Sequence, residues 1–287
     1  RAVYSKRHWG NCGKPVTDSP LYTTYNKIEN LMDKNSFEAQ LLHTPFDKED
    51  AYHSLSMPVY NTAAYEFDTA EAMEEAFCGR TADHAYSRIT NPTVQYFEKR
   101  IRTITGALSV TALNSGMAAV SNVFITLARS GANIVTSPHL FGNTYSFFKS
   151  TLAAFGVEVR FCDLTNPDEV RERVDENTCA VFLEVITNPQ LEVADLKALA
   201  GIAHQVGAPL VADTTVIPFH TFHAREFGID IEVVSSTKYI SGGATSLGLF
   251  LITVRWIGAV RRNWARWGRN SVMLLLQPNF VKRFIAI

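Results

Sequence analysis

The stretch Cys179-Ala-Val-Phe-Leu-Glu-Val185 is apolar at every position except Glu184. A strand that is apolar on both faces, with no alternation of apolar and polar residues, is typical of a parallel sheet that is covered on both sides. Helical patterns flank this strand at 168–174 and 194–206. This order of helix and strand predicts an α/β fold, with a mostly parallel sheet and helices on both of its faces.

The same alternation continues outward from this strand. Further strands are expected at 108–113, 133–136, 157–161, 209–212 and 232–235. Further helices are expected at 93–105, 116–129 and 144–155. Residues 57–64 are expected to be extended and 69–77 to form a short helix, whereas residues 1–31 show no convincing periodicity.

Polar residues follow the ends of four expected strands. They are Ser115, Asn188, Asp213 and Lys238. Parallel strands end at the same edge of a sheet, and ligands of such folds bind at that edge. We therefore expect these four residues to lie close together around a ligand.

Lys238 and Asp213 suggest which ligand. A lysine at the end of a buried strand is costly, because desolvation disfavours its charged form and makes the amine a nucleophile. Pyridoxal phosphate (PLP) needs a lysine that forms a Schiff base with its aldehyde and an acid that keeps its ring nitrogen protonated. The pair at 213 and 238 matches that requirement. A surface lysine paired with a loop aspartate is the alternative.

Three further groups of residues carry candidate phosphate contacts. Gly116, in Asn114-Ser-Gly-Met-Ala-Ala119, begins a helix whose free N–H groups favour an anion. Ser235 and Thr237 add hydroxyl donors beside the lysine. Arg88 has a planar guanidinium that suits phosphate oxygens. A capped tight turn, ordinary strand-end hydrogen bonds and a surface arginine are the alternatives.

Two turns carry candidate contacts to a pyridine ring. Phe141, in His139-Leu-Phe-Gly-Asn-Thr-Tyr145, is suited to lie flat on the ring. Asn188, in Glu184-Val-Ile-Thr-Asn-Pro189, has an amide that can donate to a ring oxygen. A core aromatic residue and a generic Asn-Pro turn are the alternatives.

Composition limits the other classes of function. The chain has 287 residues and a net charge of -1, which gives no electrostatic case for nucleic acid as the main partner. Its four cysteines form no CxxC pair, and His220 and His223 stand without a second ligand pair, so no metal site is expected. The longest apolar stretch, 247–254, is too short to span a membrane, and we expect a cytoplasmic protein.

Taken together, the motifs resemble those of the PLP-dependent enzymes of cysteine and methionine metabolism, which include O-acetylhomoserine sulfhydrylase and the cystathionine synthases and lyases. The resemblance runs from about Phe37 to Gly248. Its motifs, in order, are YSRxxNPT, SGMAA, a (Y/F)GxT turn, TNP after an acidic strand, VxD(N/T)T and SxTKY. Each motif alone is weak, but six in the correct order form a specific signal. Within the family, the chain is most similar to the O-acetylhomoserine branch.

The resemblance implies a fold-type I (aspartate aminotransferase-like) large domain and a role for each candidate residue. Lys238 is implied as the Schiff-base lysine and Asp213 as the partner of the ring nitrogen. The other implied positions are Ser235, Thr237, Gly116 and Met117 around the phosphate, Asn188 near the ring oxygen, and Phe141 stacked on the ring in place of a common tyrosine. Tyr86 and Arg88 are implied to reach the phosphate of a neighbouring subunit, in a homodimer or homotetramer.

The implied reaction is γ-replacement on O-acetyl-L-homoserine, in which sulfide or a thiol gives homocysteine or methionine. Three alternatives stay open. The first is a cystathionine γ-synthase or γ-lyase activity. The second is a truncated PLP-binding relative with little turnover. The third is an unrelated doubly wound protein that binds a nucleotide at the Ser115–Met117 turn.

The resemblance also divides the chain. The expected segments are a leader at 1–31, an N-terminal arm at 32–92, a PLP-binding α/β domain at 93–248 and a basic tail at 249–287. The tail stands where family members carry a small C-terminal domain, whose arginine grips the substrate carboxylate. No Asp or Glu follows Glu232, whereas eight Lys or Arg do. We therefore hypothesise that residues from about Leu249 are an out-of-frame translation, and that residues 1–31 precede a native start at Met32.

Overall fold

The computed structural model describes residues 35–46, 52, 54–243 and 246–253. The chain divides into two compact units between Thr44 and Pro45. The described part of the first unit is helix α2 (Phe37–His43), which begins after Ser36 because the Ser36 hydroxyl accepts a hydrogen bond from the Ala39 N–H. The expected leader at 1–31 and most of the expected tail lie outside the described residues. Within the described residues, no helix combines the length and the apolar character that crossing a membrane requires.

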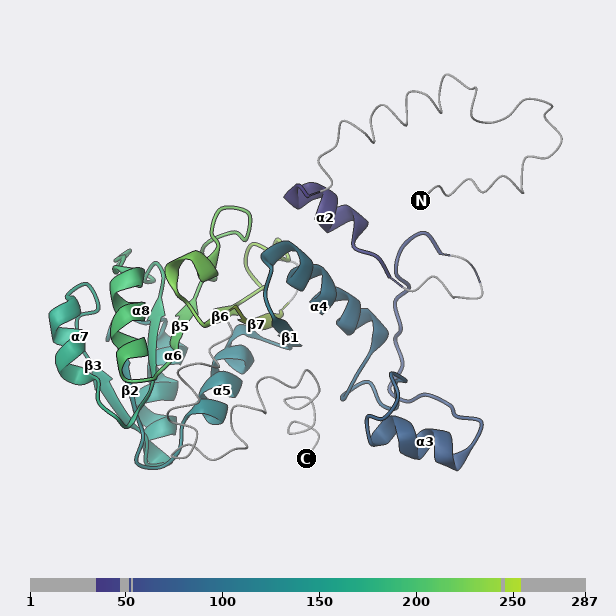
Figure 1. Ribbon diagram of the computed structural model, residues 1–287, viewed down its shortest axis with the longest axis horizontal. Helices are drawn as coiled ribbons and strands as arrows, with labels where there is room; N and C mark the ends of the chain where they lie inside the picture. The colour runs from purple at the N-terminus through teal and green to yellow at the C-terminus, as the bar shows by residue number, and fades with distance from the viewer. Residues whose placement is uncertain (1–34, 47–51, 53, 244–245, 254–287) are drawn as a thin grey trace, which may run out of the picture. The chain divides into compact units, whose positions relative to one another are not determined.

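The second unit is built on a seven-stranded sheet of order β1-β7-β6-β5-β4-β2-β3 (Figure 1). The strands are β1 (Ser109–Leu113), β2 (Asn133–Thr136), β3 (Glu158–Phe161), β4 (Thr178–Glu184), β5 (Leu210–Asp213), β6 (Ile231–Val234) and β7 (Gly248–Ile252). Strand β7 pairs antiparallel with both β1 and β6, and every other pair is parallel. The expectation of a mostly parallel sheet is confirmed.

Helices cover both faces of this sheet. Those of the second unit are α3 (Ala70–Phe77), α4 (Pro92–Thr105), α5 (Gly116–Leu127), α6 (Gly142–Ser146), the π-helix η2 (Phe147–Leu152), α7 (Pro167–Arg173), α8 (Leu196–Gln205) and the 3-10 helix η3 (Ala224–Phe227). Helices α5 and η2 pack on one face, and α7, α8 and η3 pack on the other. All seven residues of β4 are buried between these layers, as its unbroken apolar sequence predicts.

Most elements expected from the sequence are present within a few residues of their predicted ends. Two expectations are modified by the structure. The helix expected at 144–155 is α6 continued by η2, in which the hydrogen bonds widen to a π-helix. Residues 57–64 form no strand of the sheet, although Ala64 makes an isolated antiparallel bridge to Tyr86.

Strand β7 was not expected from the sequence, and its presence changes one predicted boundary. Leu249 and Leu251 are completely buried, and the strand lies between β1 and β6. A boundary between 248 and 249 would therefore cut through a central strand. Residues 249–252 belong to the sheet, which does not fit an out-of-frame tail that begins at about Leu249. Residues 254–287 of the expected tail lie outside the described part of the chain.

Candidate functional site at the carboxyl ends of the strands

The candidate residues lie along one edge of the sheet, where β1, β4, β5 and β6 end. Parallel pairing puts the ends of β4, β5 and β6 at this edge. Antiparallel β7 begins there with Gly248, opposite Leu113 at the end of β1. This arrangement follows from the fold and brings residues far apart in sequence to one site.

A turn suited to an anion lies where β1 leads into α5. Ser115 caps the helix by accepting a hydrogen bond from the Ala118 N–H at 3.1 Å. Among the described residues, no acceptor pairs with the N–H groups of Gly116 and Met117, as expected for the first turn of a helix. A Cβ at position 116 would lie 2.6 Å from the Cβ of Ser235. Gly116 therefore lets the helix start approach the segment that leads to Lys238.

A chain of hydrogen bonds joins Ser235 to Asp213. The Ser235 N–H donates to the Thr215 hydroxyl oxygen at 2.8 Å, and the Thr215 N–H donates to Asp213 Oδ1 at 2.9 Å. Burial raises the pKa of Asp213, whereas the hydrogen bonds from Thr215 lower it. The expected phosphate and ring-nitrogen contacts are thus held in one connected network.

Two further carboxyl groups lie beside Asp213. Glu184 is opposite Asp213 in the pairing of β4 with β5, so these two side chains share a face of the sheet. Glu232, on β6, is opposite Ala212, and its side chain is directed to the other face. Burial, with a smaller contribution from the charge of Asp213, raises the pKa of Glu184 and of Glu232 to about 7. In the part of the chain that the structure describes, none of the three forms an ion pair with a basic side chain. This end of the site can therefore accommodate a cation.

Phe141 and Asn188 are brought together by Glu184. The Phe141 N–H donates to Glu184 Oε1 at 2.5 Å, and the Asn188 N–H donates to Glu184 Oε2 at 3.1 Å. Both side chains are exposed, with Phe141 at 46% of its full accessible surface. They are thus presented at the rim of the site and are not packed into the core, so the alternative of a core aromatic at Phe141 is wrong.

Lys238 lies in the turn that follows β6. Its N–H donates to the Ser235 carbonyl at 3.1 Å, and its own carbonyl accepts from the Gly243 N–H at 3.2 Å. Its side chain is exposed, so the expectation of a lysine buried in the chain is wrong. The reason is that β6 ends at Val234 and the turn carries the lysine out of the core. The neighbouring Thr237 hydroxyl bonds the Leu247 N–H and carbonyl, which ties this turn to the start of β7.

Tyr86 and Arg88 form a separate group near the start of α5. The guanidinium carbon of Arg88 lies 5.1 Å from the centre of the Tyr86 ring. Arg88 also lines a cavity of about 570 Å³, together with Asn114, Ala118, Asn122 and Leu247. No hydrogen bond or ion pair within the described residues joins Tyr86 or Arg88 to Lys238, Asp213 or Ser235.

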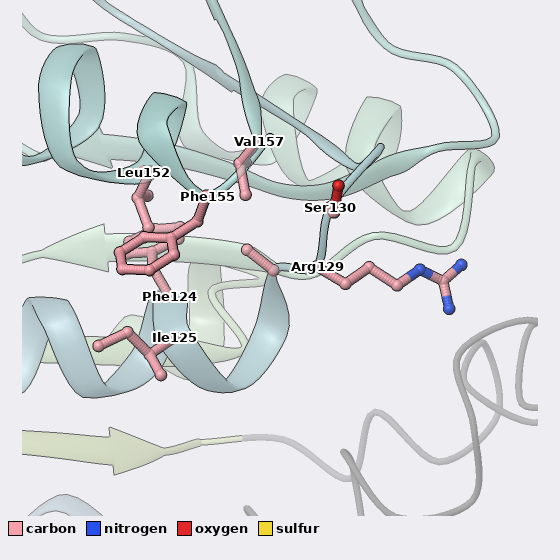
Figure 2. Close-up of a pocket in the computed structure, with 8 residues that line it drawn as sticks. Phe124, Ile125, Arg129, Ser130, Leu152, Phe155 and Val157 are labelled. Atoms are coloured by element: carbon pink, nitrogen blue, oxygen red, sulfur yellow. The ribbon is translucent and has the colours of Figure 1, made fainter.

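A smaller cavity of about 270 Å³ lies at the opposite edge of the sheet (Figure 2). Apolar side chains at the end of α5 and after η2 line it, including Phe124, Ile125 and Phe155, while the guanidinium of Arg129 points away from them. None of the candidate residues lines this cavity. Nor do the described residues hold any group of three His, Cys, Asp or Glu arranged to bind a metal ion.

Sequence reasoning missed three residues of this site: Glu184, Thr215 and Gly248. A signal for Glu184 was present, because a carboxylate ends an otherwise apolar strand just as Asp213 does. Thr215 follows Asp213 closely, but its link to Ser235 joins residues 20 apart in sequence. Gly248 is the last residue of the family resemblance, and no motif or periodicity predicts a structural role for it.

The buried carboxyl of Glu232 predicts a pH dependence of stability. Because its pKa rises from 4.5 to about 7, the folded chain holds a proton that the unfolded chain has already released. The free energy of unfolding must therefore fall as the pH rises through this window. In the parent chain, the Thr214 hydroxyl donates a hydrogen bond to Glu232 Oε1 at 2.5 Å. The Glu232→Gln variant keeps an oxygen that can accept this bond, but its side chain cannot titrate.

We expect the free energy of unfolding to fall between about pH 5 and about pH 8 in the parent chain. In the Glu232→Gln variant, this fall should be smaller by on the order of 3 kcal/mol. Urea denaturation at both pH values measures this difference. Equal pH dependence of the two proteins would mean that Glu232 titrates alike in the folded and unfolded chains.

This chain is similar to known proteins of one enzyme family. Residues 38–265 match the family model of the Cys/Met metabolism PLP-dependent enzymes. The chain is 36% identical over 223 residues to O-acetyl-L-homoserine sulfhydrylase of Corynebacterium glutamicum. This match covers 77% of this chain and 51% of the sulfhydrylase. It is 35% identical over 206 residues to L-methionine gamma-lyase of Fusobacterium nucleatum subsp. nucleatum, over 71% of this chain and 52% of that one.

A solved structure agrees with these similarities. It is that of a putative O-acetylhomoserine (thiol)-lyase from Campylobacter jejuni with N'-pyridoxyl-lysine-5'-monophosphate, and it matches with a TM-score of 0.77 and 29% identity. The match covers 88% of this chain and 64% of that one. The chain spans about half the length of the curated relatives that it matches. Its sequence, its fold and these matches show that the chain belongs to the Cys/Met metabolism PLP-dependent enzymes, whose cofactor is pyridoxal phosphate.

Proposed function

We propose that this chain binds PLP at the carboxyl edge of its sheet and that Lys238 is the residue that binds the cofactor covalently. The observation that carries the proposal is the close approach of Gly116 to Ser235. It joins a helix start, whose first two N–H groups have no acceptor among the described residues, to the segment that bears Lys238. Thr215 extends the same network to Asp213.

The charges of the site fit the two ends of the cofactor. A phosphate would accept hydrogen bonds from the N–H groups of Gly116 and Met117 and from the Ser235 hydroxyl. The Thr237 hydroxyl, which donates to the Leu247 carbonyl in the structure, would turn from that carbonyl to donate to the phosphate. The protonated ring nitrogen would face Asp213, next to Glu184, and neither carboxyl has a basic partner among the described residues. A dianion at one end and a cation at the other is the charge pattern that these residues favour.

The remaining residues would orient the ring. Phe141 would stack on its face and Asn188 would donate to its ring oxygen. When bound, PLP supplies an electron-accepting ring that stabilises negative charge on the adjoining substrate carbon. Nζ of Lys238 would remove the proton from the substrate Cα and return it at the neighbouring carbons, because its exposed side chain is free to reach them.

We propose γ-replacement on O-acetyl-L-homoserine as the reaction of the whole protein. Acetate leaves the γ carbon, and the sulfur of sulfide or a thiol bonds to that carbon to give homocysteine or methionine. The similarity to sulfhydrylases supports this choice. A γ-elimination is the second candidate, because a methionine gamma-lyase is similar at nearly the same level of identity.

We also propose that the active protein is a homo-oligomer in which Tyr86 and Arg88 serve the site of a neighbouring subunit. The exposed guanidinium of Arg88 is suited to reach a phosphate outside its own subunit. Gel filtration with light scattering tests this point, and a monomer that binds PLP with full affinity would contradict it.

Reconstitution with PLP tests the proposed function. We expect a visible absorption band that borohydride removes, and a reduced pyridoxyl group on the peptide that contains Lys238. Homocysteine formed from O-acetyl-L-homoserine and sulfide would support γ-replacement, whereas methanethiol released from methionine would support elimination. Binding without either turnover would identify a cofactor-binding relative, and binding of a nucleotide with no absorption band would contradict the proposal.

A further inference from the structure

The carboxylate of Glu184 links the two loops that carry the proposed ring contacts. Phe141 follows β2 and Asn188 follows β4, and these strands are neighbours in the sheet. The Glu184 side chain is 7% exposed, and its two oxygens accept separate hydrogen bonds from the N–H groups of Phe141 and Asn188. One buried side chain therefore holds the backbone of both loops directly at Phe141 and Asn188.

This arrangement matters because packing does not hold Phe141 or Asn188 in place. Both side chains are exposed, so the position of each depends on its backbone. The hydrogen bonds to Glu184 fix the backbone of each residue at its own N–H. An uncharged amide in place of Glu184 has one acceptor and one donor group, so it cannot accept from both N–H groups through two oxygens.

The stability of the fold alone does not explain a glutamate at position 184. A buried carboxyl without a basic partner is unfavourable, and the described residues provide Glu184 with no ion pair. The neighbouring Asp213 adds repulsion when both are ionised. The role of Glu184 is better explained by the positions that its side chain imposes on Phe141 and Asn188.

We propose that Glu184 is a positioning residue, which fixes the stacking residue Phe141 and the amide of Asn188 at the spacing that the cofactor ring requires. This inference rests on the proposed function, because the roles of Phe141 and Asn188 come from it. Glu184 itself need not touch the cofactor.

The test compares Glu184→Gln with a matched control, Glu192→Gln. Glu192 Oε2 lies 2.7 Å from His139 Nδ1 and joins the same two loops at the surface, where both side chains are more than a third exposed. PLP affinity is measured by titration, and the fixed orientation of the ring by circular dichroism in the visible band. We expect roughly 10-fold weaker binding and a reduced dichroic signal in Glu184→Gln, and less than about a two-fold change in Glu192→Gln.

Glu184→Asp is a milder second variant, in case the glutamine variant does not fold. Its carboxylate keeps both oxygens and the charge, but it is one methylene shorter and cannot span both N–H groups. An intermediate loss of dichroism in this variant supports the proposal. Unchanged affinity and dichroism in either folded Glu184 variant would overturn it, as would equal losses in Glu184→Gln and Glu192→Gln. Failure of the parent chain to form the borohydride-sensitive band would instead refute the proposed function.

Discussion

The Lys238→Ala variant is expected to lose the borohydride-sensitive absorption of the PLP-treated chain completely while it keeps its fold. The band depends on a covalent bond to one amine, and alanine has no amine to form it. Lys238 is exposed in a turn, so its truncation leaves no cavity in the core. Absorption before and after borohydride measures the first effect, and far-ultraviolet circular dichroism measures the second.

Lys197→Ala provides the control for this experiment. Lys197 is exposed on α8, with its Nζ 5.7 Å from the centre of the Phe227 ring. Its replacement should leave the absorption band unchanged. Weaker, non-covalent binding of PLP to Lys238→Ala is compatible with the proposal, because the contacts from Gly116 and Ser235 remain. Recovery of the same reducible band in Lys238→Ala would show that another amine captures the cofactor.

The sheet was largely predictable because its central strands β2, β4 and β6 are buried on both faces. Strand β2 begins and ends where the sequence predicts, and β4 differs by one residue at each end. Such strands need no knowledge of their neighbours, since burial on both sides is visible in the sequence itself. Helix α5 was equally clear, because Ser115 and Gly116 mark its start and small or apolar residues continue it.

Strand β7 was not predictable by the same reasoning. It is the one antiparallel strand of the sheet, and it does not follow from the alternation of helices and parallel strands. Residues 249–252 of this strand fall in the expected tail, which lacks acidic residues. Only the burial of Leu249 and Leu251 between β1 and β6 separates it from that tail.

The candidate site was predicted as a set of residues but not as a network. The motifs indicate which side chains gather at the edge of the sheet. They do not indicate that a carboxylate on β4 accepts hydrogen bonds from the backbone of a residue 43 positions away. Backbone N–H groups are the same in every sequence, so a contact such as that of Glu184 with Phe141 requires the three-dimensional structure. The exposure of Lys238 has a similar origin, because it depends on where β6 stops.

The Gly248→Ala substitution is expected to disrupt the turn at Ser115 and Gly116, the proposed phosphate site, more than the addition of a methyl group elsewhere in the site. A Cβ at 248 would lie 1.9 Å from the Ser115 carbonyl oxygen and 2.7 Å from the Gly116 nitrogen. Both contacts involve backbone, so no side-chain rotation relieves them. Strand β7 cannot move away, because it is hydrogen-bonded to β1 on one side and β6 on the other. The start of α5 must therefore shift, and its unpaired N–H groups shift with it.

We expect this variant to lose about 3 kcal/mol or more of its free energy of unfolding and to bind PLP at least about 10-fold more weakly. Gly201→Ala is the matched control, since a Cβ there meets nothing within 4 Å and alanine favours the interior of α8. Urea denaturation and PLP titration of both variants measure the effects, and the control should be unchanged or more stable. Parental stability and affinity in Gly248→Ala would mean that β7 does not pack against the Ser115 turn. The site would then depend only on the parallel strands, and residues 248–252 would lose the role that the structure assigns to them. The comparison of Gly248→Ala with Gly201→Ala thus tests whether strand β7, which was not expected from the sequence, is part of the cofactor site.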